Sequence, residues 1–176
     1  MDILVTPTSG HRGTLRLGDD AYACALGRSG VTANKHEGDG ATPAGRFPLR
    51  AIRYRADRLT PPDTGLPAAA IDPADGWCDA PDDPAHYNRP VSLPHATSAE
   101  RMWRDDGLYD LLVILGHNDA PPVPGLGSAI FLHCARIDGD GILGPTEGCV
   151  ALPRTTLLEL VPRLAAETMI EIRAGA

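Results

Sequence analysis

Two side chains in the last third of the chain could together perform nucleophilic chemistry, Cys149 and His133. Cys149 lies in the segment Pro145-Thr-Glu-Gly-Cys-Val150, and His133 ends an apolar run sixteen residues earlier. A thiol attacks only as the thiolate, and a neighbouring imidazole can accept its proton and stabilise the charge. The pair predicts a covalent thioester mechanism, provided that adjacent strands bring the two side chains together.

The alternation of side chains along a strand predicts which residues beside His133 face the cleft and which face the core. Phe131 and His133 share one face of the predicted strand, and Leu132 and Cys134 share the other. If His133 faces a cleft, Cys134 faces the core and packs as a small apolar side chain, while its backbone carbonyl can orient the His133 ring. Gly148 lets the chain approach a substrate without a Cβ in the way, which suits backbone donors near an oxyanion.

The elements that must position these residues are predicted to be mainly strands. High Gly and Pro, at 19 and 17 residues, favour many turns and little long helix. A helix is expected to start at Pro153 and to break or kink at Pro162. We expect a β-sandwich of mixed sheets with a short helix after the Cys and a long irregular cap. The predicted strands cover residues 3–5, 14–17, 22–26, 46–52, 109–115, 129–134, 146–152 and 169–172.

The segment 55–107 shows no sustained periodicity and is rich in Pro and Asp. Trp77, Tyr87 and Trp103 argue against plain disorder, so we expect an ordered cap or one wall of a cleft. A surface excursion that only plugs the core is the alternative. The whole chain, 1–176, is predicted to be one catalytic domain with this segment as an insertion.

Composition narrows the function classes. Hydrophobic residues make up 43% and charged residues 22%, and the formal net charge of −7 makes nucleic acid a poor partner. The sequence has no secretory signal pattern and no apolar run long enough to span a bilayer, so a cytoplasmic location is expected. The cysteines Cys24, Cys78, Cys134 and Cys149 are then expected to be thiols, with a secreted protein of two disulfides as the alternative.

Two motifs resemble a known family. The segment Gly127-Ser-Ala-Ile-Phe-Leu-His133, followed by Pro-Thr-Glu-Gly-Cys149-Val, resembles the catalytic motif of the L,D-transpeptidase (YkuD-like) family: a His, a gap of this length, then Ser/Thr-x-Gly-Cys and an aliphatic residue. The stretch Gly38-Asp-Gly-Ala-Thr-Pro-Ala-Gly-Arg-Phe47-Pro resembles its Thr-Pro-x-Gly-x-Phe signature. Two departures stand out, because the family usually has His where this chain has Glu147 and Arg where it has Ala151.

The resemblance implies roles for these positions. Cys149 is the acyl-accepting nucleophile, His133 the base and the Cys134 carbonyl the orienting group, with the N–H groups of Gly148 and Cys149 at the oxyanion. A carboxylate at Glu147 would raise the thiol pKa, so this side chain must point away or bind a substrate amine.

The implied substrate is a peptidoglycan stem tetrapeptide, attacked between a third-position diamino acid and the terminal D-Ala. With a cytoplasmic location, this favours an L,D-carboxypeptidase of muropeptide recycling, with an L,D-transpeptidase as the alternative. No cofactor, nucleic acid or membrane partner is expected. Candidate substrate contacts are Arg28, Arg104 and Arg136 for the terminal carboxylate, Trp103 beside Arg104, His117 and Asn118 at a strand end, and Glu147.

Two readings from other classes stay open. Zinc could recruit His117, His133, Cys134 and Cys149, although no paired-ligand spacing supports such a site and alternation separates His133 from Cys134. A non-catalytic peptidoglycan-binding module is the other, and it should tolerate Cys149→Ser without loss of function.

Overall fold

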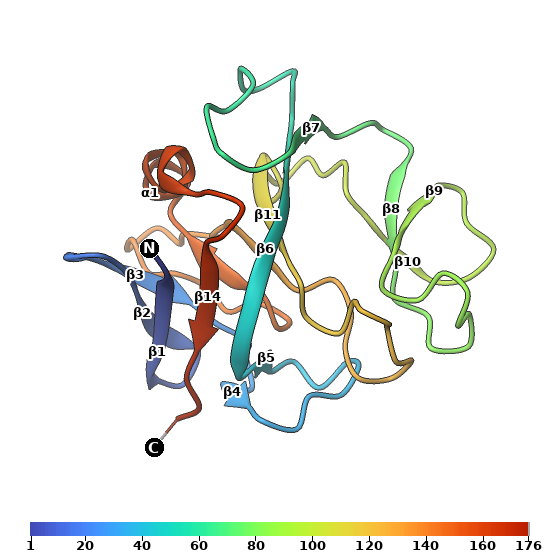
Figure 1. Cartoon of the computed structure of the whole chain (residues 1–176), viewed down its shortest axis with the longest axis horizontal. Helices are drawn as coiled ribbons and strands as arrows, with labels where there is room; N and C mark the ends of the chain where they lie inside the picture. The colour runs from blue at the N-terminus through green and yellow to red at the C-terminus, as the bar shows by residue number, and fades with distance from the viewer. Residues whose placement is uncertain (176) are drawn as a thin grey trace.

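The predicted strands assemble into a nine-stranded mixed sheet that closes on itself. The computed structural model describes residues 1–175 (Figure 1). The sheet order is β11-β12-β13-β3-β2-β1-β14-β6-β7, and β6 also pairs with β11, so that all its strands except β7 form a ring. Its strands are β1 (Ile3–Ser9), β2 (Arg12–Leu17), β3 (Asp20–Ala25), β6 (Gly45–Tyr54), β7 (Ala68–Ala70), β11 (Leu111–Leu115), β12 (Phe131–Cys134), β13 (Val150–Leu152) and β14 (Met169–Ile172).

Local sequence explains the main turns of this ring. β2 and β3 form the predicted antiparallel hairpin across Gly18, whose φ of 62° favours a residue without a Cβ. The helix α1 (Arg154–Leu160) begins directly after Pro153, as expected. It passes into the 3₁₀ turn η1 (Val161–Arg163) at Pro162, which has no N–H to donate to a further helical turn.

Two hydrophobic clusters lie on opposite faces of the β11–β12–β13 segment. The larger one fills the ring and takes Leu132 and Cys134 from β12. The smaller one lies on the other face and takes Phe131 from β12 together with Cys149 and Trp77. The strand alternation inferred from the sequence is therefore present in the structure, and the second cluster is what the cap packs against.

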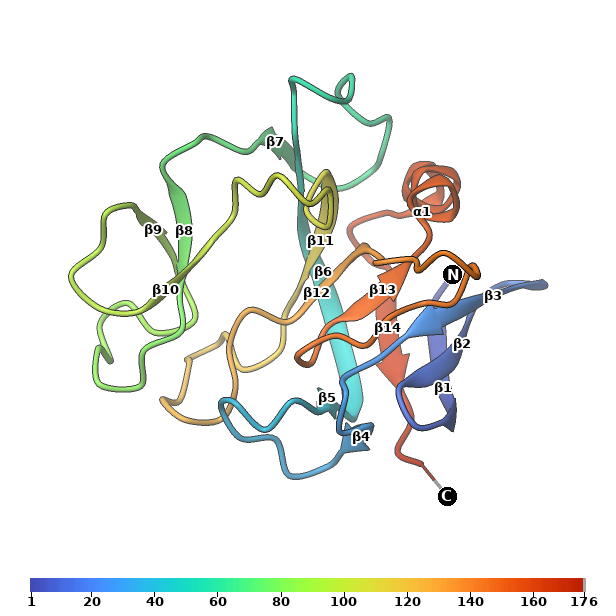
Figure 2. The same cartoon turned by 180° about the vertical axis from the view of Figure 1, so that it is seen from behind.

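The segment 55–107 covers one side of the ring, opposite to the β1–β2–β3 hairpins (Figures 1 and 2). It is less irregular than expected, because β8 (Asp75–Cys78), β9 (Pro90–Ser92) and β10 (Ala99–Arg101) form a small antiparallel sheet with β8 in the middle. Trp77 of β8 packs edge-to-face on Phe131, with ring centroids 5.2 Å apart. Short strands of three or four residues without alternating hydrophobicity explain why the sequence gives no strand signal here.

A buried asparagine joins this cap to the loops beside β12. The side-chain oxygen of Asn88 accepts hydrogen bonds from the Trp77 indole at 2.9 Å and the Ala129 N–H at 3.0 Å. Its amide donates to the carbonyls of His117 at 3.0 Å and Asn118 at 2.7 Å. One side chain thus ties the cap to both ends of the loop that joins β11 to β12.

The mainly β fold with mixed sheets and one short helix is confirmed. A further small pair, β4 (Val31–Thr32) with β5 (Thr42–Pro43), brackets the Gly-rich loop of residues 33–41. All four cysteines are free thiols and buried. Among residues 1–175, no helix has the length and apolar character that crossing a membrane requires.

Candidate active site

The parallel pairing of β12 with β13 brings the predicted nucleophile and base to one face of the sheet. His133 pairs with Ala151, so that Cys149, two residues before Ala151, lies opposite Phe131. The backbone N–H of Phe131 donates to the Cys149 sulfur at 3.4 Å, and the thiol donates to the Ala129 carbonyl at 3.3 Å. Both Cys149 and His133 line the same pocket. The sequence separation of sixteen residues is spanned by the loop between the two strands.

The ring of His133 is held in one orientation. Its Nδ1 lies 2.8 Å from the carbonyl oxygen of Cys134. A carbonyl can only accept, so Nδ1 carries the proton and Nε2 is the basic nitrogen. The ring also packs edge-to-face with Tyr109, at a centroid distance of 5.3 Å. The backbone of Cys134 thus takes the orienting position that the resemblance implies.

Burial sets the charge state of the pair in the absence of substrate. Loss of solvation lowers the pKa of His133 to about 4 and raises that of Cys149 to about 12. The carboxylate of Glu100 adds to the rise in the Cys149 pKa. At neutral pH the site holds a thiol and a neutral imidazole, so that proton transfer must accompany attack on a bound carbonyl.

The pocket around this pair has a volume of about 550 Å³ and is built from three parts of the chain. Ring residues around β12 and β13 supply one wall, including His133 and Cys149. The cap supplies Asp79, Glu100 and Arg104, and the Gly-rich loop supplies Lys35 and Glu37. The predicted role of the 55–107 segment as a cleft wall agrees with this lining.

The conformation at Gly148 agrees with the need for glycine, but its N–H is occupied. Its φ is 143°, and a Cβ there would lie 3.0 Å from the Ala41 carbonyl oxygen. The Gly148 N–H donates to Thr146 Oγ1 at 3.2 Å, and that hydroxyl donates to the Cys149 carbonyl at 2.7 Å. In this state Gly148 shapes the turn rather than offering a free oxyanion donor, and the Cys149 N–H is the remaining predicted donor.

Three of the predicted substrate contacts line the pocket, namely Arg104, Arg136 and Glu147. Glu147 points toward solvent, since its side chain is 80% exposed and its carboxylate lies 2.8 Å from Arg28 Nε. The first of the two expectations for this residue, that it points away from the thiol, agrees with this geometry. Ala151, at the family's Arg position, is buried. The cations in the pocket wall are Lys35, Arg104 and Arg136 instead.

Four predicted contacts lie outside the pocket lining: Arg28, Trp103, His117 and Asn118. Trp103 lies under the Arg55 guanidinium, 3.6 Å from the ring centroid. His117 Nε2 bonds the Leu126 carbonyl at 3.0 Å. Asn118 donates to the carbonyls of Val123 at 3.0 Å and Gly127 at 2.9 Å. The polar groups of His117 and Asn118 hold loops, Arg28 is paired with Glu147, and the Trp103 ring is covered by Arg55, so direct substrate contact by these residues finds no support in the geometry.

Several pocket residues escaped the sequence analysis, among them Lys35, Glu37, Asp79 and Glu100. Lys35 is only 8% exposed and forms an ion pair with Asp39. Polar side chains in a Gly-rich loop and an aperiodic cap look like solvated surface in sequence. The one available signal was the position of Lys35 and Glu37 directly before the Gly38–Phe47 motif.

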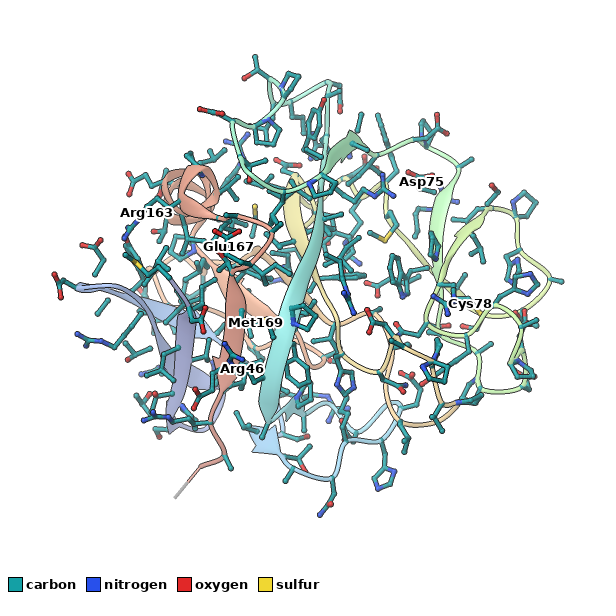
Figure 3. The ribbon with its side chains drawn as sticks, viewed as in Figure 1. Arg46, Asp75, Cys78, Arg163, Glu167 and Met169 are labelled. Carbon is teal, nitrogen blue, oxygen red and sulfur yellow. The ribbon has the colours of Figure 1, made fainter. Side chains whose placement is uncertain are left out.

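The zinc alternative finds no support in the geometry, because Cys134 lies in the ring core and Cys149 on the opposite face of the sheet. A different group exists on the cap, where ligand atoms of Cys78, Asp83 and His95 lie within 4.8 Å of one another in the described residues. Cys78 belongs to β8, in the cap lobe (Figure 3). The Asp83 carboxylate accepts hydrogen bonds from His86 at 2.9 Å and His95 at 3.0 Å, so it is already paired.

Comparison with known proteins agrees with the two motifs. The family model of the L,D-transpeptidase catalytic domain, YkuD, matches residues 3–172. No curated protein matches the chain, and no solved structure matches it either. The matched range includes the whole ring, the cap and the pocket that holds Cys149 and His133. The chain therefore belongs to the YkuD family of L,D-transpeptidase catalytic domains.

Proposed function

We propose that the protein is an L,D-carboxypeptidase that removes the terminal D-Ala from stem tetrapeptides. Membership of the YkuD family supports the wider class, cysteine-dependent acyl transfer on peptidoglycan peptides. The observation that carries the proposal is the shared pocket of Cys149 and His133, with His133 Nδ1 fixed on the Cys134 carbonyl. With the proton on Nδ1, Nε2 is the ring nitrogen that can accept the thiol proton.

The first half of the reaction forms a thioester. The Cys149 thiol exchanges its hydrogen bond with the Ala129 carbonyl for one with His133 Nε2, and the sulfur attacks the carbonyl carbon of the third residue. The proton moves to His133. As the C–N bond breaks, the imidazolium returns that proton to the departing amine, and D-Ala leaves. We assign stabilisation of the oxyanion to Lys35 and the Cys149 N–H, because both residues line the pocket.

The second half decides between hydrolysis and transfer. Water, deprotonated by His133, attacks the thioester and releases a tripeptide and the free thiol. Arg104 and Arg136 line the pocket and suit the terminal carboxylate of the tetrapeptide, as a carboxypeptidase requires. A pocket of about 550 Å³ is in the range that binds small molecules and short peptides. We propose soluble muropeptides in the cytoplasm as the substrate, which subcellular fractionation tests directly.

Incubation of the purified protein with a free tetrapeptide muropeptide tests the reaction by mass spectrometry. The expected products are tripeptide and D-Ala, with no turnover by Cys149→Ala. Addition of a different D-amino acid tests transfer in the same tube, because exchange of the terminal residue would make the enzyme a transpeptidase. If the wild type produces neither result, the enzymatic proposal is wrong.

A further inference from the structure

Four side chains of the kinds that bind metal ions converge in the cap, outside the catalytic pocket. Cys78 ends β8, Asp83 and His86 lie in the turn that follows, and His95 lies in the loop between β9 and β10 (Figure 3). One ligand atom each from Cys78, Asp83 and His95 lies within 4.8 Å of the other two. Two different loops thus bring sulfur, oxygen and nitrogen donors to one point, and none of the four residues lines the pocket of Cys149.

The Asp83 carboxylate is the centre of this cluster. Its Oδ2 lies 3.0 Å from His86 Nδ1, from His95 Nε2 and from Thr97 Oγ1. The two imidazole rings meet edge-to-face, with centroids 5.0 Å apart. Two of the three donors to Asp83 are therefore imidazoles, and a metal ion can replace the proton in an imidazole–carboxylate hydrogen bond because each group then offers it a lone pair.

The Cys78 thiol has no partner of comparable strength. The residue is fully buried, and its sulfur lies 3.9 Å from Thr97 Oγ1, at the outer limit of a hydrogen bond to sulfur. A thiol gains little from a nearby carboxylate or imidazole, whereas the thiolate is a strong ligand of zinc. One sulfur, one oxygen and two nitrogen donors suit Zn²⁺, while Mg²⁺ and Ca²⁺ prefer oxygen ligands alone.

The part of the cap around this cluster, residues 78–98, contributes no residue to either hydrophobic cluster of the described chain. Its only strand beyond the end of β8 is the three-residue β9. Small lobes that lack an apolar core are commonly held together by a disulfide or by a structural metal ion. Cys78 is a free thiol, so a disulfide does not stabilise this segment.

We propose that Cys78, Asp83, His86 and His95 bind a structural zinc ion that fastens the two loops of the cap together. With zinc–ligand bonds of about 2.0–2.3 Å, neighbouring ligand atoms of a tetrahedral site lie roughly 3.3–3.6 Å apart. The contacts of Asp83 are close to this spacing, so small side-chain rotations complete the site. The His86 side chain is 54% exposed, which gives the ion a path from solvent.

Binding must release protons. Cys78 loses its thiol proton to solvent as the zinc–sulfur bond forms, and His95 keeps its single ring proton on Nδ1 so that Nε2 can bind the metal. Zinc affinity is therefore expected to fall as the pH is lowered. The inference is independent of the reaction at Cys149, because none of the proposed ligands takes part in it.

Thermal unfolding of the full chain, freed of metal with EDTA and then given ZnCl₂, tests the site. The Tm of the wild type is expected to rise by about 5–10 °C at a hundredfold excess of zinc over Kd, with one zinc per chain after dialysis. Cys78→Ser and His95→Gln should each weaken zinc binding at least about tenfold. His36→Gln, which changes an exposed histidine of the Gly-rich loop, is the matched control and should bind zinc as the wild type does.

Cobalt(II) gives a measurement on chains that keep all the proposed ligands. Cobalt bound to a thiolate in a tetrahedral site shows a sulfur-to-metal charge-transfer band in the near ultraviolet and d–d bands in the visible. Both are expected in the wild type and in Cys149→Ala, which lacks the pocket thiol. Loss of these bands in Cys149→Ala would place the metal at the catalytic pocket and overturn the proposal.

Three other results would also overturn it. The first is a Tm of the wild type that does not change with zinc at millimolar concentration. The second is the same zinc affinity in Cys78→Ser, His95→Gln and the wild type, which would place the ion elsewhere. The third is an equal rise in Tm with Mg²⁺, which would indicate binding by carboxylates without the thiol.

Discussion

Cys134 and Cys149 lie on opposite faces of the same strand pair, and the comparison shows what makes one of them a candidate nucleophile. Both are buried, and burial raises the pKa of each thiol, to about 11 and about 12 respectively. Cys134 faces the hydrocarbon inside the ring and donates to the Leu111 carbonyl. Cys149 faces a pocket that also contains His133. Neither burial nor pKa distinguishes them; access to a cleft and to a base does.

The largest difference between the two cysteines should appear on their removal. Cys149→Ala is expected to abolish release of D-Ala, by roughly 10³-fold or more, because no other group can form the thioester. Cys134→Ala should retain turnover and lose about 1–2 kcal/mol of the free energy of unfolding by leaving a small cavity. Steady-state kinetics and urea unfolding measure both. Loss of activity in Cys134→Ala with an intact fold would show that Cys134 also takes part in the reaction.

Replacing the base, His133, should have the next largest effect on turnover. His133→Gln retains a polar side chain of similar shape but cannot accept the thiol proton, so kcat is expected to fall by roughly 10²–10⁴-fold. His117→Gln is the matched control, because His117 holds a loop outside the pocket and its substitution should change kcat little. Similar losses in the two variants would argue that histidine chemistry is not localised at His133.

Thiol reactivity can sharpen the comparison without substrate. A folded pKa of about 12 leaves little thiolate at pH 8, so native Cys149 should react with iodoacetamide roughly 10³-fold more slowly than in unfolded protein. Cys134 should be slower still, because it lies in the ring core. Peptide mapping of time-resolved labelling measures each rate. Labelling of Cys134 before Cys149 would contradict the assignment of faces.

The free energy of unfolding should also fall at low pH, because His133 is buried as a neutral ring. The folded pKa of His133, about 4, lies below the ordinary value of 6.5, so the unfolded state binds the proton more readily. The stability contributed by the neutral ring is fully present above pH 6.5 and is lost as pH falls toward 4, by about 3 kcal/mol. Urea unfolding at pH 7.5 and pH 4.5 should show this excess loss in the wild type relative to His133→Gln. Identical losses in the two proteins would mean that the ring is solvated.

The smallest effect is expected at the rim of the pocket. Glu147 and Arg28 form an exposed ion pair, and such pairs contribute about 0–1 kcal/mol. Glu147→Gln should change kcat/KM less than about threefold and leave Tm nearly unchanged. A fall of tenfold or more would show that Glu147 leaves Arg28 during the reaction and contacts the substrate.

The sequence predicts the ring better than the pocket wall, and the reason is physical. Apolar runs in the sequence predict strands such as 111–115 and 131–134. Apolar residues at helical spacing between two prolines predict α1. The two motifs predict that their strands are neighbours, whereas the parallel direction of β12 and β13 is seen only in the structure. The sequence thus predicts the face of Cys134 and the presence of Cys149 and His133 at one pocket.

The cap residues lack any such periodic signal. Asp79 and Glu100 resemble solvated surface in sequence, because only tertiary packing brings them to the pocket. His117 and Asn118 mislead for the opposite reason: they follow a strand end, where binding residues often lie, yet the loop they join needs their polar groups for itself. To predict the roles of His117 and Asn118, one would need to know which loops fold back on the strands β11 and β12.

The chain leaves the ring at the end of β6 and returns at the start of β11, two strands that are direct hydrogen-bonded neighbours. Tyr54 pairs with Leu111, and the Arg55 N–H donates to the Asp110 carbonyl at 2.9 Å. The exit and the re-entry therefore lie side by side at one hairpin junction, and the excursion between them is further held by the pairing of β7 with β6 and by Asn88. A change of length between these attachments can leave the junction in place, and with it the strands that carry the thiol and the imidazole.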